Sequence, residues 1–222
     1  MNMLNSSSLM YRQTESLPKS PDIPFHEPFG FEITRGEKTW QVYGGSFFHK
    51  PWVEDADQDP FFSINLMAEH PLPCTYYVPI KDFSVPDDEA VLVKSIEHAL
   101  KDGRPIYVGC FGGIGRTGLW LACMLKALGE PDPVVAVRRW FYRHAVETEA
   151  QQAFVHDFSA HRVQIEPQRQ FQQEASDESV LRRVEHIKTD SVVHVHPSSE
   201  EASSIIIPQD DPSWFKKWFS KH

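Results

Sequence analysis

One stretch constrains the fold of this chain more than any other, the run from Cys110 to Gly118 with the sequence CFGGIGRTG. Residues 105–108 before it form a short apolar run typical of a buried strand, and residues 119–125 after it are apolar on every side, as in a buried helix. The glycine-rich run therefore connects a strand to the N-terminus of a helix. Unpaired backbone N–H groups and the positive end of the helix dipole meet at such a junction, and together they favour binding of a phosphate dianion.

Three side chains in this run carry the chemistry. A thiol at a helix N-terminus beside a guanidinium is favoured in its thiolate form, so Cys110 is the candidate nucleophile. Arg116 has a planar fork of donors that fits two equatorial oxygens of a phosphoryl group. We expect Thr117 to donate its hydroxyl to the sulfur and to help it leave in a second step. The predicted phosphate-binding residues are Phe111, Gly112, Gly113, Ile114, Gly115 and Arg116.

The run resembles the active-site signature of the cysteine-dependent protein tyrosine phosphatases, which is a cysteine, five residues, an arginine and then serine or threonine. Residues 78–86, VPIKDFSVP, are similar to the general-acid loop of the compact dual-specificity branch, where Asp82 would protonate the leaving oxygen. Residues 145–151, AVETEAQ, resemble the stretch from which Gln151 would position the hydrolytic water. The resemblance covers residues 39–162.

The resemblance implies a protein phosphatase that acts on phosphotyrosine, and on phosphoserine or phosphothreonine as further substrates, through a cysteinyl-phosphate intermediate. Cys110 would attack phosphorus, and Asp82 would act first as acid and then, with Gln151, as base toward water. Arg116 and the loop amides would stabilise charge throughout. No metal or cofactor is implied. Because Cys110 must be deprotonated while Asp82 is protonated, we expect a bell-shaped pH profile on the acid side of neutral.

One departure from the family leaves a second interpretation open. Histidine usually precedes the nucleophile and orders the loop, but this chain has Gly109. A looser loop would make the domain a weak or inactive phosphatase-like module that holds a phosphorylated partner in a larger assembly. An enzyme acting on phosphorylated lipids, sugars or RNA 5′ ends is a third possibility. The net charge of −9 disfavours it and argues against nucleic-acid binding.

The cysteine count and the apolar segments bear on location. Three cysteines without a framework spacing suggest a reducing compartment. We place Cys123 in the core, and Cys74 is either a buried thiol or a protective disulfide partner for Cys110. We find no targeting segment and no apolar run long enough to span a bilayer, so we expect the cytoplasm, or a host cytoplasm.

The chain divides into three parts by composition. We expect residues 1–38 to be a polar arm, residues 39–162 the catalytic domain, and residues 163–222 a C-terminal extension. The acidic residues 54–59 favour a solvated loop over a metal site. Strands are predicted at 40–48, with a hairpin around Gly44 and Gly45 as the alternative, and at 62–66, 75–78 and 106–108; helices are predicted at 86–101, from Asp132 onward and within 147–162.

These elements predict an α/β fold with a central mixed, mainly parallel sheet flanked by helices, and a catalytic loop at a strand's carboxyl end. The helix that follows Asp132 carries Arg138, Arg139 and Arg143, either bracing the phosphate loop or on a solvated face. In the extension, His194 and His196 alternate on one strand face but lack a third metal ligand. Residues 214–219 are aromatic on one helical face and basic on another, so we expect them to dock on a partner protein or back onto the domain in preference to a membrane surface.

Overall fold

The computed structural model describes residues 9–17, 25–51 and 59–165. They form a six-stranded sheet in the order β1-β2-β3-β6-β4-β5. The strands β3, β6, β4 and β5 run parallel to one another, whereas β2 is antiparallel to both β1 and β3. This confirms the predicted mixed, mainly parallel sheet. The strands are β1 (Met10–Gln13), β2 (Phe29–Arg35), β3 (Lys38–Ser46), β4 (Phe62–Met67), β5 (Tyr76–Ile80) and β6 (Ile106–Cys110).

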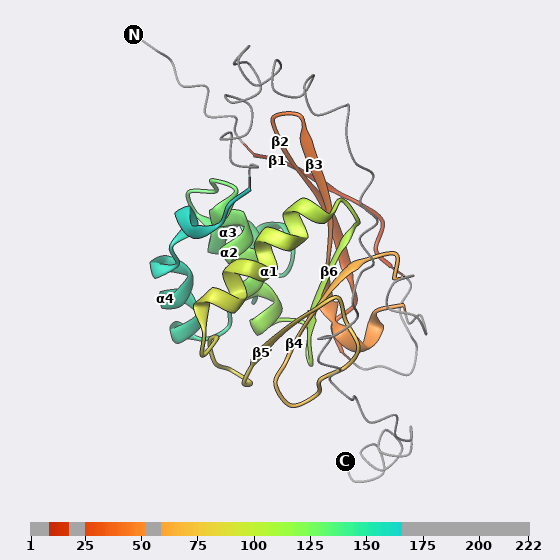
Figure 1. The fold of residues 1–222 in the computed structure, drawn as a ribbon, viewed down its shortest axis with the longest axis vertical. Coiled ribbons are helices and arrows are strands. Elements are labelled where there is room, and N and C mark those ends of the chain that lie inside the picture. The colour runs from red at the N-terminus through yellow and green to blue at the C-terminus, as the bar shows by residue number, and fades with distance from the viewer. Residues whose placement is uncertain (1–8, 18–24, 52–58, 166–222) are drawn as a thin grey trace, which may run out of the picture. The chain divides into compact units, whose positions relative to one another are not determined.

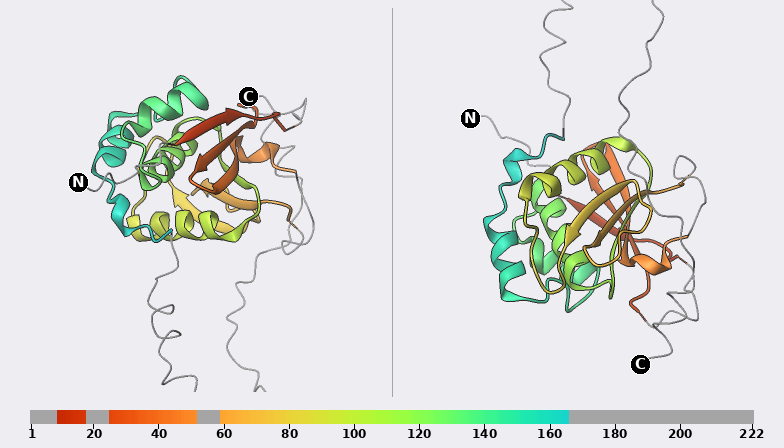
Figure 2. Two further views of the ribbon diagram at one scale, coloured as in Figure 1. Left: turned by 90° about the horizontal axis from the view of Figure 1, so that it is seen from above. Right: turned by 60° about the horizontal axis from the view of Figure 1, so that its bottom comes forward.

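Four α-helices of the described part gather on one side of this sheet (Figure 1). The carboxyl ends of the four parallel strands lie at the bottom of Figure 1 and come forward in the right-hand view of Figure 2. The helices are α1 (Glu89–Asp102), α2 (Gly115–Ala127), α3 (Pro133–Trp140) and α4 (Glu149–Asp157), and two short 3₁₀ helices are η1 (Phe47–His49) and η3 (Ala160–Arg162).

Capping residues explain where two of these helices begin. The Asp88 side chain accepts a hydrogen bond from the Ala90 N–H, which makes it the N-cap of α1. The helix begins at Glu89, three positions later than the predicted start at residue 86. Gly103, with φ of 91°, ends α1 as predicted. Asp132 caps α3 and Pro133 takes its first position, also as predicted.

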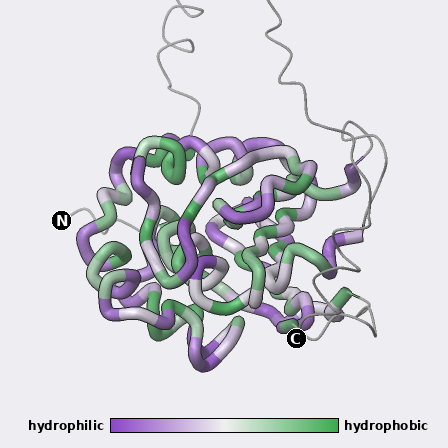
Figure 3. The backbone as a smooth tube through the Cα atoms, turned by 90° about the horizontal axis from the view of Figure 1, so that it is seen from below, coloured by the Kyte–Doolittle hydropathy of each residue, from purple (hydrophilic) through white to green (hydrophobic). Residues whose placement is uncertain are grey.

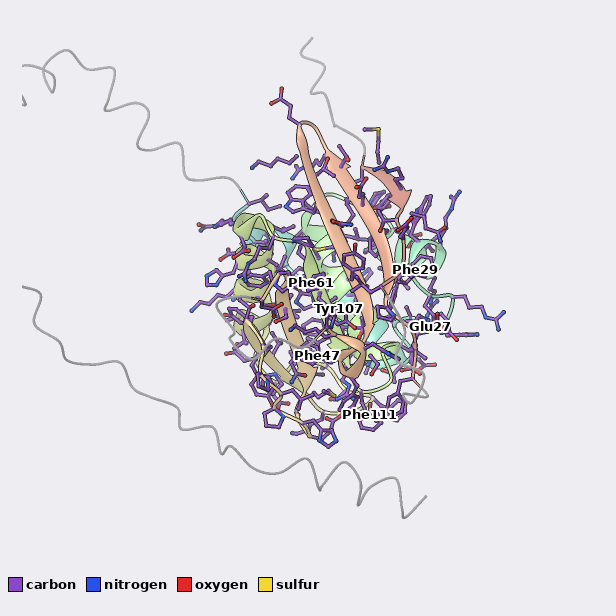
Figure 4. All side chains as sticks on the ribbon, turned by 90° about the vertical axis from the view of Figure 1, so that its right-hand side faces the viewer. Glu27, Phe29, Phe47, Phe61, Tyr107 and Phe111 are labelled. Carbon is purple, nitrogen blue, oxygen red and sulfur yellow. The ribbon has the colours of Figure 1, made fainter. Side chains whose placement is uncertain are left out.

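The helix that follows the glycine-rich run is the centre of the core. Every residue of α2 from Gly115 to Leu125 is buried, which confirms the expectation of a helix without a solvated face, and Cys123 is among them. In the hydropathy-coloured trace, many hydrophobic segments lie inside the fold (Figure 3). A row of aromatic side chains lies on the other side of the sheet, in the order Phe61, Tyr107, Phe47 and Phe111 (Figure 4). The Tyr107 ring makes edge-on contacts with the rings of both Phe61 and Phe47.

The predicted domain boundary at residue 39 is wrong, because the described parts of residues 1–38 supply β1 and β2 to the sheet. Phe31 and Ile33 are alternate residues of β2, and both are buried in the core. Composition alone does not reveal this period-two pattern. The hairpin alternative at Gly44 and Gly45 is also wrong. These residues continue β3, and the turn of the β2–β3 hairpin contains Gly36, whose φ is 61°.

Several predictions fall on residues outside the described ranges: the metal pair His194 and His196, the docking segment 214–219, and residues 54–58 of the acidic loop. Asp59 is described, and its predicted exposure is wrong. It is buried, and its carboxylate pairs with the Lys50 ammonium at 2.7 Å. Within the described ranges, no cluster of side chains suited to a metal is found. The helices there are also too short or too polar to cross a bilayer.

Candidate phosphate-binding site

The carboxyl end of each parallel strand contributes a residue to one site. Ser46 ends β3 and Cys110 ends β6, while Glu69 follows β4 and Asp82 follows β5. Because parallel strands present their carboxyl ends at one edge, residues distant in sequence meet there. The strand, loop and helix around Cys110 are as predicted, since β6 ends at Cys110 and α2 begins at Gly115.

The sulfur of Cys110 lies inside the loop. Cys110 is 3% exposed, and its Sγ accepts a hydrogen bond from the Gly113 N–H at 3.2 Å. Gly113 has φ of 80°, a left-handed conformation that glycine adopts without the steric cost of a Cβ atom. The loop thus directs a backbone donor at the candidate nucleophile, as a site for a negatively charged sulfur and a phosphate requires.

Arg116 is buried, and its guanidinium is held at one end. Nη1 and Nη2 each donate to a carboxylate oxygen of Glu69 at 2.7 Å, and Nη1 also donates to the carbonyl of Ile80 at 2.9 Å. Nη2 lies 3.1 Å from Oδ1 of Asp82. Nε is buried and has no hydrogen-bond partner among the described residues. Nη2 is thus engaged by Glu69 and Asp82, whereas Nε remains available to an anion, which explains an otherwise unsatisfied donor.

The charges of this arrangement reinforce one another. Burial opposes the charged form of Arg116, but the hydrogen bond to Glu69 and the negative charges of Cys110, Glu69 and Asp82 raise its pKa above the usual value. Burial also opposes ionisation of Glu69, yet the hydrogen bond and charge of Arg116 hold the pKa of Glu69 below its usual value. Glu69 is therefore a carboxylate that orients the guanidinium at neutral pH.

Asp82 lies where a leaving group can reach it. An open cavity of about 500 Å³ is lined by Ala68, Glu69, Lys81, Asp82 and Phe111. The Asp82 side chain is 62% exposed, and its Oδ1 accepts a hydrogen bond from the Phe83 N–H at 3.1 Å. The predicted acid and Phe111 of the phosphate loop thus line the same cavity, together with Glu69, which binds the predicted phosphate-binding arginine.

The Thr117 hydroxyl has backbone partners in this structure instead of the predicted sulfur. Its Oγ1 accepts a hydrogen bond from the Cys110 N–H at 3.0 Å and donates to the carbonyl of Gly45 at 3.4 Å. Thr117 therefore ties the nucleophile's own backbone to β3. The predicted bond to Sγ is absent from this arrangement because the hydroxyl is already engaged by these two groups.

Gln151 is near the site but fully buried. Its amide nitrogen donates to the carbonyl of Ser84 in the predicted acid loop at 3.1 Å, and its carbonyl oxygen accepts from the Thr148 N–H at 3.4 Å. Together with Thr148, it forms the capping box that starts α4. These bonds connect α4 to the acid loop. The role of Gln151 in positioning water stays a prediction.

Glu147 is a site residue that sequence reasoning missed. Its carboxylate lies against Gly115 and accepts the backbone N–H of that residue at the start of α2. Partial burial and then the charge of Asp82 raise the pKa of Glu147 above its usual value. Arg138 holds the preceding turn by donating to the carbonyls of Ala145 and Val146, so this arginine braces the segment that carries Glu147.

Glu147→Gln is expected to stabilise the domain at neutral pH. A carboxyl with a raised folded-state pKa binds more protons when folded, so stability falls as pH rises from the unfolded value of 4.5 through the folded one. The gain should therefore be present at pH 7.5 and disappear below about pH 4. Melting temperatures of both proteins at the two pH values measure it. An equal difference at both pH values would contradict this electrostatic account.

The signals for the missed residues are positional. Ser46 lies two residues before the end of the predicted strand 40–48, and Glu69 lies three residues after the predicted strand 62–66, at the edge where parallel strands place ligands. Glu147 stands in the stretch compared with the family's water-positioning segment. Its approach to Gly115 depends on the packing of the turn before α4, which local sequence does not encode.

The space beside Gly109 is filled by backbone. A Cβ atom at this position would lie 2.8 Å from both N and Cα of Phe47 and 2.9 Å from the carbonyl oxygen of Gly45. A histidine side chain therefore does not fit here. The chain packs β3 and η1 directly against the strand end that carries the nucleophile, so the expectation of a looser loop does not follow from the glycine alone.

The three cysteines are free. The sequence predicts that Cys74 is either a buried thiol or a disulfide partner of Cys110, and in the structure it is a free thiol. The residue is partly buried, and burial raises its pKa to about 11. Cys123 is fully buried, and burial raises its pKa well above the usual value. Both side chains are therefore poor nucleophiles near neutral pH, in contrast with the position of Cys110 at the loop.

Comparison with known proteins gives a matching family. Residues 66–130 match the family described as "Polymorphic toxin system, DSP-PTPase phosphatase". An uncharacterized protein of Methanocaldococcus jannaschii is 38% identical over 95 residues, which cover 41% of this chain and 65% of the relative. A second uncharacterized protein from the same organism is 37% identical over 86 residues, which cover 38% of this chain and 54% of the relative. The chain thus spans less than two thirds of the length of either curated relative.

Two solved structures are similar to parts of the chain. Tk-PTP in its active form is 22% identical with a TM-score of 0.42, covering 53% of this chain and 90% of that one. Kinase associated phosphatase, with serine in place of its catalytic cysteine, is 18% identical with a TM-score of 0.41. The similarity covers 55% of this chain and 85% of that one. The family match spans Glu69, Asp82, Cys110 and Arg116, so residues 66–130 are similar to the dual-specificity-like cysteine phosphatases.

Proposed function

We propose that this domain is a protein phosphatase that hydrolyses phosphotyrosine, with phosphoserine and phosphothreonine as further substrates. The observation that carries the proposal is that a Gly113 N–H is directed at Cys110 Sγ, beside a buried Arg116 whose Nε has no hydrogen-bond partner among the described residues. The family match and the phosphatase-type fold support phosphatase activity as such. The cysteinyl-phosphate mechanism and the choice of phosphorylated residue are our inferences from the site.

The first chemical step transfers the phosphoryl group to sulfur. The Cys110 thiolate attacks phosphorus, the bond from phosphorus to the ester oxygen breaks, and the protonated Asp82 gives its proton to that oxygen. The Nε and Nη2 donors of Arg116 hold two equatorial oxygens, with phosphate replacing Asp82 at Nη2, while Glu69 keeps the guanidinium oriented from its other end. The loop amides stabilise the charge that spreads over the equatorial oxygens.

The second step releases phosphate. Water attacks phosphorus, the sulfur–phosphorus bond breaks, and the Asp82 carboxylate takes the proton from water, which restores thiolate and acid. We propose that Gln151 helps to position this water, and that its bond to Ser84 keeps the acid loop in place. Asp82 can reach the substrate in both steps because its side chain is exposed and lines the cavity.

The cavity wall favours an aromatic leaving group. Phe111 lines the cavity and packs against Phe25, Phe48 and His70, with ring centroids 4.6, 5.4 and 5.6 Å away. A rigid aromatic wall beside the phosphate loop suits the ring of a phosphotyrosine. Because the cavity is open to solvent at Asp82, shorter phosphorylated side chains are expected to reach the loop less favourably but not to be excluded.

The test is release of phosphate from peptides that differ only in the phosphorylated residue. We expect vanadate-sensitive turnover, with the phosphotyrosine peptide preferred over the matching phosphoserine and phosphothreonine peptides. No release from any of them, with phosphate still bound at the loop, would support the alternative of a phosphatase-like module that holds a phosphorylated partner. Release from inositol phosphates or RNA 5′ ends alone would reject protein substrates.

Glu69→Gln is expected to lower kcat/KM for para-nitrophenyl phosphate about tenfold. The amide keeps the size and one acceptor but loses a charged hydrogen bond that holds the buried guanidinium, a difference of about 1.4 kcal/mol. Steady-state kinetics measure the effect, and Glu97→Gln, a change on α1 remote from the cavity, is the matched control. Unchanged or faster turnover would mean that Glu69 competes with substrate instead of orienting Arg116.

A further inference from the structure

The phosphate loop rests on two successive layers of backbone. The first is the end of β3, where Gly45 pairs with Gly109 and Ser46 pairs with Cys110. A Cβ atom at Gly113 would overlap the backbone of Gly45 and Ser46, so the loop lies directly on this strand end. The second layer is the segment of residues 25–28. A Cβ atom at Gly45 would lie 2.8 Å from Cα of Pro28, so this segment covers the strand end closely.

Each layer binds one carbonyl of the loop from outside. The Ser46 hydroxyl donates to the carbonyl of Phe111 at 2.6 Å. The backbone N–H of His26, in the segment 25–28, donates to the carbonyl of Gly112 at 3.2 Å. The two layers are themselves connected, because the Ser46 N–H donates to the carbonyl of His26 at 3.0 Å. The carbonyl oxygens of the peptide units 111–112 and 112–113 are therefore both held by hydrogen bonds.

A tethered carbonyl fixes where the next N–H points. In a planar trans peptide, C=O and N–H point in opposite directions, so a carbonyl bound on the outside turns the following N–H inward. The unit between Gly112 and Gly113 shows this relation: His26 holds its oxygen, and its N–H donates to Sγ of Cys110. By the same geometry, the bond from Ser46 to Phe111 turns the Gly112 N–H away from Ser46.

Side chains secure the outer layer. The Phe25 ring packs against Phe111 at 4.6 Å, and the Phe25 carbonyl lies 3.2 Å from Nε2 of His49, within hydrogen-bond distance. Tyr107 donates its hydroxyl to the carbonyl of Ser46 at 2.7 Å and so fixes the inner layer. Figure 4 shows Glu27, which follows His26 in the outer segment, beside the face that carries Phe47 and Phe111. Residues 25–28 and Ser46 all lie outside the residues 66–130 that match the family.

We infer that Ser46 and residues 25–28 are positioning elements of the anion site, which hold the loop carbonyls outward and direct the loop amides at phosphate. They take the place of an ordering side chain at position 109, where backbone leaves no room for one. The inference rests on the proposed use of this loop for phosphate, but it concerns binding of the anion and not turnover. The N-terminal segment is thus part of the phosphate site.

The experiment measures phosphate binding without requiring catalysis. Cys110 of the full chain is alkylated with iodoacetamide at rising concentrations of inorganic phosphate, and mass spectrometry of the Cys110 peptide gives the phosphate concentration for half-protection. Ser46→Ala removes the tether to Phe111, and Phe25→Ala removes the ring that holds the outer segment. The matched controls are Ser95→Ala, a buried serine on α1 with two hydrogen bonds, and Phe154→Ala, a partly buried phenylalanine on α4.

We expect Ser46→Ala to raise the half-protection concentration about tenfold, the worth of one buried hydrogen bond, and Phe25→Ala to raise it about threefold. Ser95→Ala and Phe154→Ala should lower the melting temperature as much but leave half-protection within about twofold of the wild type. A loss of stability alone therefore does not reproduce the result. If Ser46→Ala does not fold, the comparison of half-protection between Phe25→Ala and Phe154→Ala tests the inference.

The outcomes separate the two proposals. Equal half-protection in the site variants and their controls overturns the inference, as does a wild type that phosphate does not protect. A wild type that phosphate protects, with the expected shifts in the variants but no hydrolysis of any phosphomonoester, overturns the proposed function and leaves the inference standing.

Discussion

Cys110→Ser is expected to lower vanadate-sensitive phosphate release from para-nitrophenyl phosphate by on the order of a thousandfold or more. Serine fills nearly the same space, so the buried loop remains folded, but its neutral hydroxyl is a far weaker nucleophile than a thiolate. The Gly113 N–H and the Arg116 fork stay in place, so binding of phosphate should persist while turnover is lost. Steady-state rates and phosphate affinity measured on the same preparation separate the two effects.

Cys74→Ser is the matched control for this result. Cys74 is a partly buried free cysteine whose pKa burial raises to about 11, so it is a neutral thiol near pH 7. The variant should retain wild-type kcat/KM within about twofold. Equal loss in both variants would point to a general effect of removing a thiol, and equal activity of Cys110→Ser and wild type would reject Cys110 as the nucleophile.

Gly113→Ala is expected to lower kcat/KM by on the order of a hundredfold, the typical cost of removing one donor from an anion hole. Gly113 has φ of 80°, and a Cβ atom there would overlap the backbone of Gly45 and Ser46. The loop must therefore move away from β3, and the Gly113 N–H then loses its direction toward Sγ. We also expect a loss of stability of about 1–3 kcal/mol from the strained backbone, measured by denaturant unfolding.

Gly112→Ala separates this effect from a general intolerance of the loop. A Cβ atom at Gly112 meets no other atom within 4 Å, and its φ is outside the left-handed region. This variant should keep kcat/KM within about threefold of the wild type and its stability within about 0.5 kcal/mol. Similar losses in both variants would show that the loop rejects any side chain, and that the packing of Gly113 on β3 is not the cause.

The central motif and the helix boundaries were predictable because their causes are local. The strand, glycine loop and buried helix around Cys110 follow from an apolar run on each side of a flexible turn. Asp132 before Pro133 and Gly103 after α1 fix helix ends through bonds made within a few residues.

The supports of the site were less predictable because they are made by long-range packing. Glu69 meets Arg116 only when β4 and β6 are neighbours, and Glu147 meets Gly115 only when the turn before α4 packs on α2. β2 was missed because its alternating residues lie in a segment rich in proline and serine, where composition suggested an arm. The role predicted for Thr117 depended on a hydroxyl direction that the backbone of β3 sets.

The most direct test of the account is detection of the phosphoryl group on sulfur. The wild-type protein is mixed with para-nitrophenyl phosphate, quenched in acid within the first turnovers and digested, and the peptide that contains Cys110 is examined by mass spectrometry. We predict one added phosphoryl group on Cys110, accumulating further in Asp82→Asn when an activated aryl phosphate is used. Steady phosphate release with an unmodified Cys110 peptide, or with the phosphoryl group on another residue, would contradict the account.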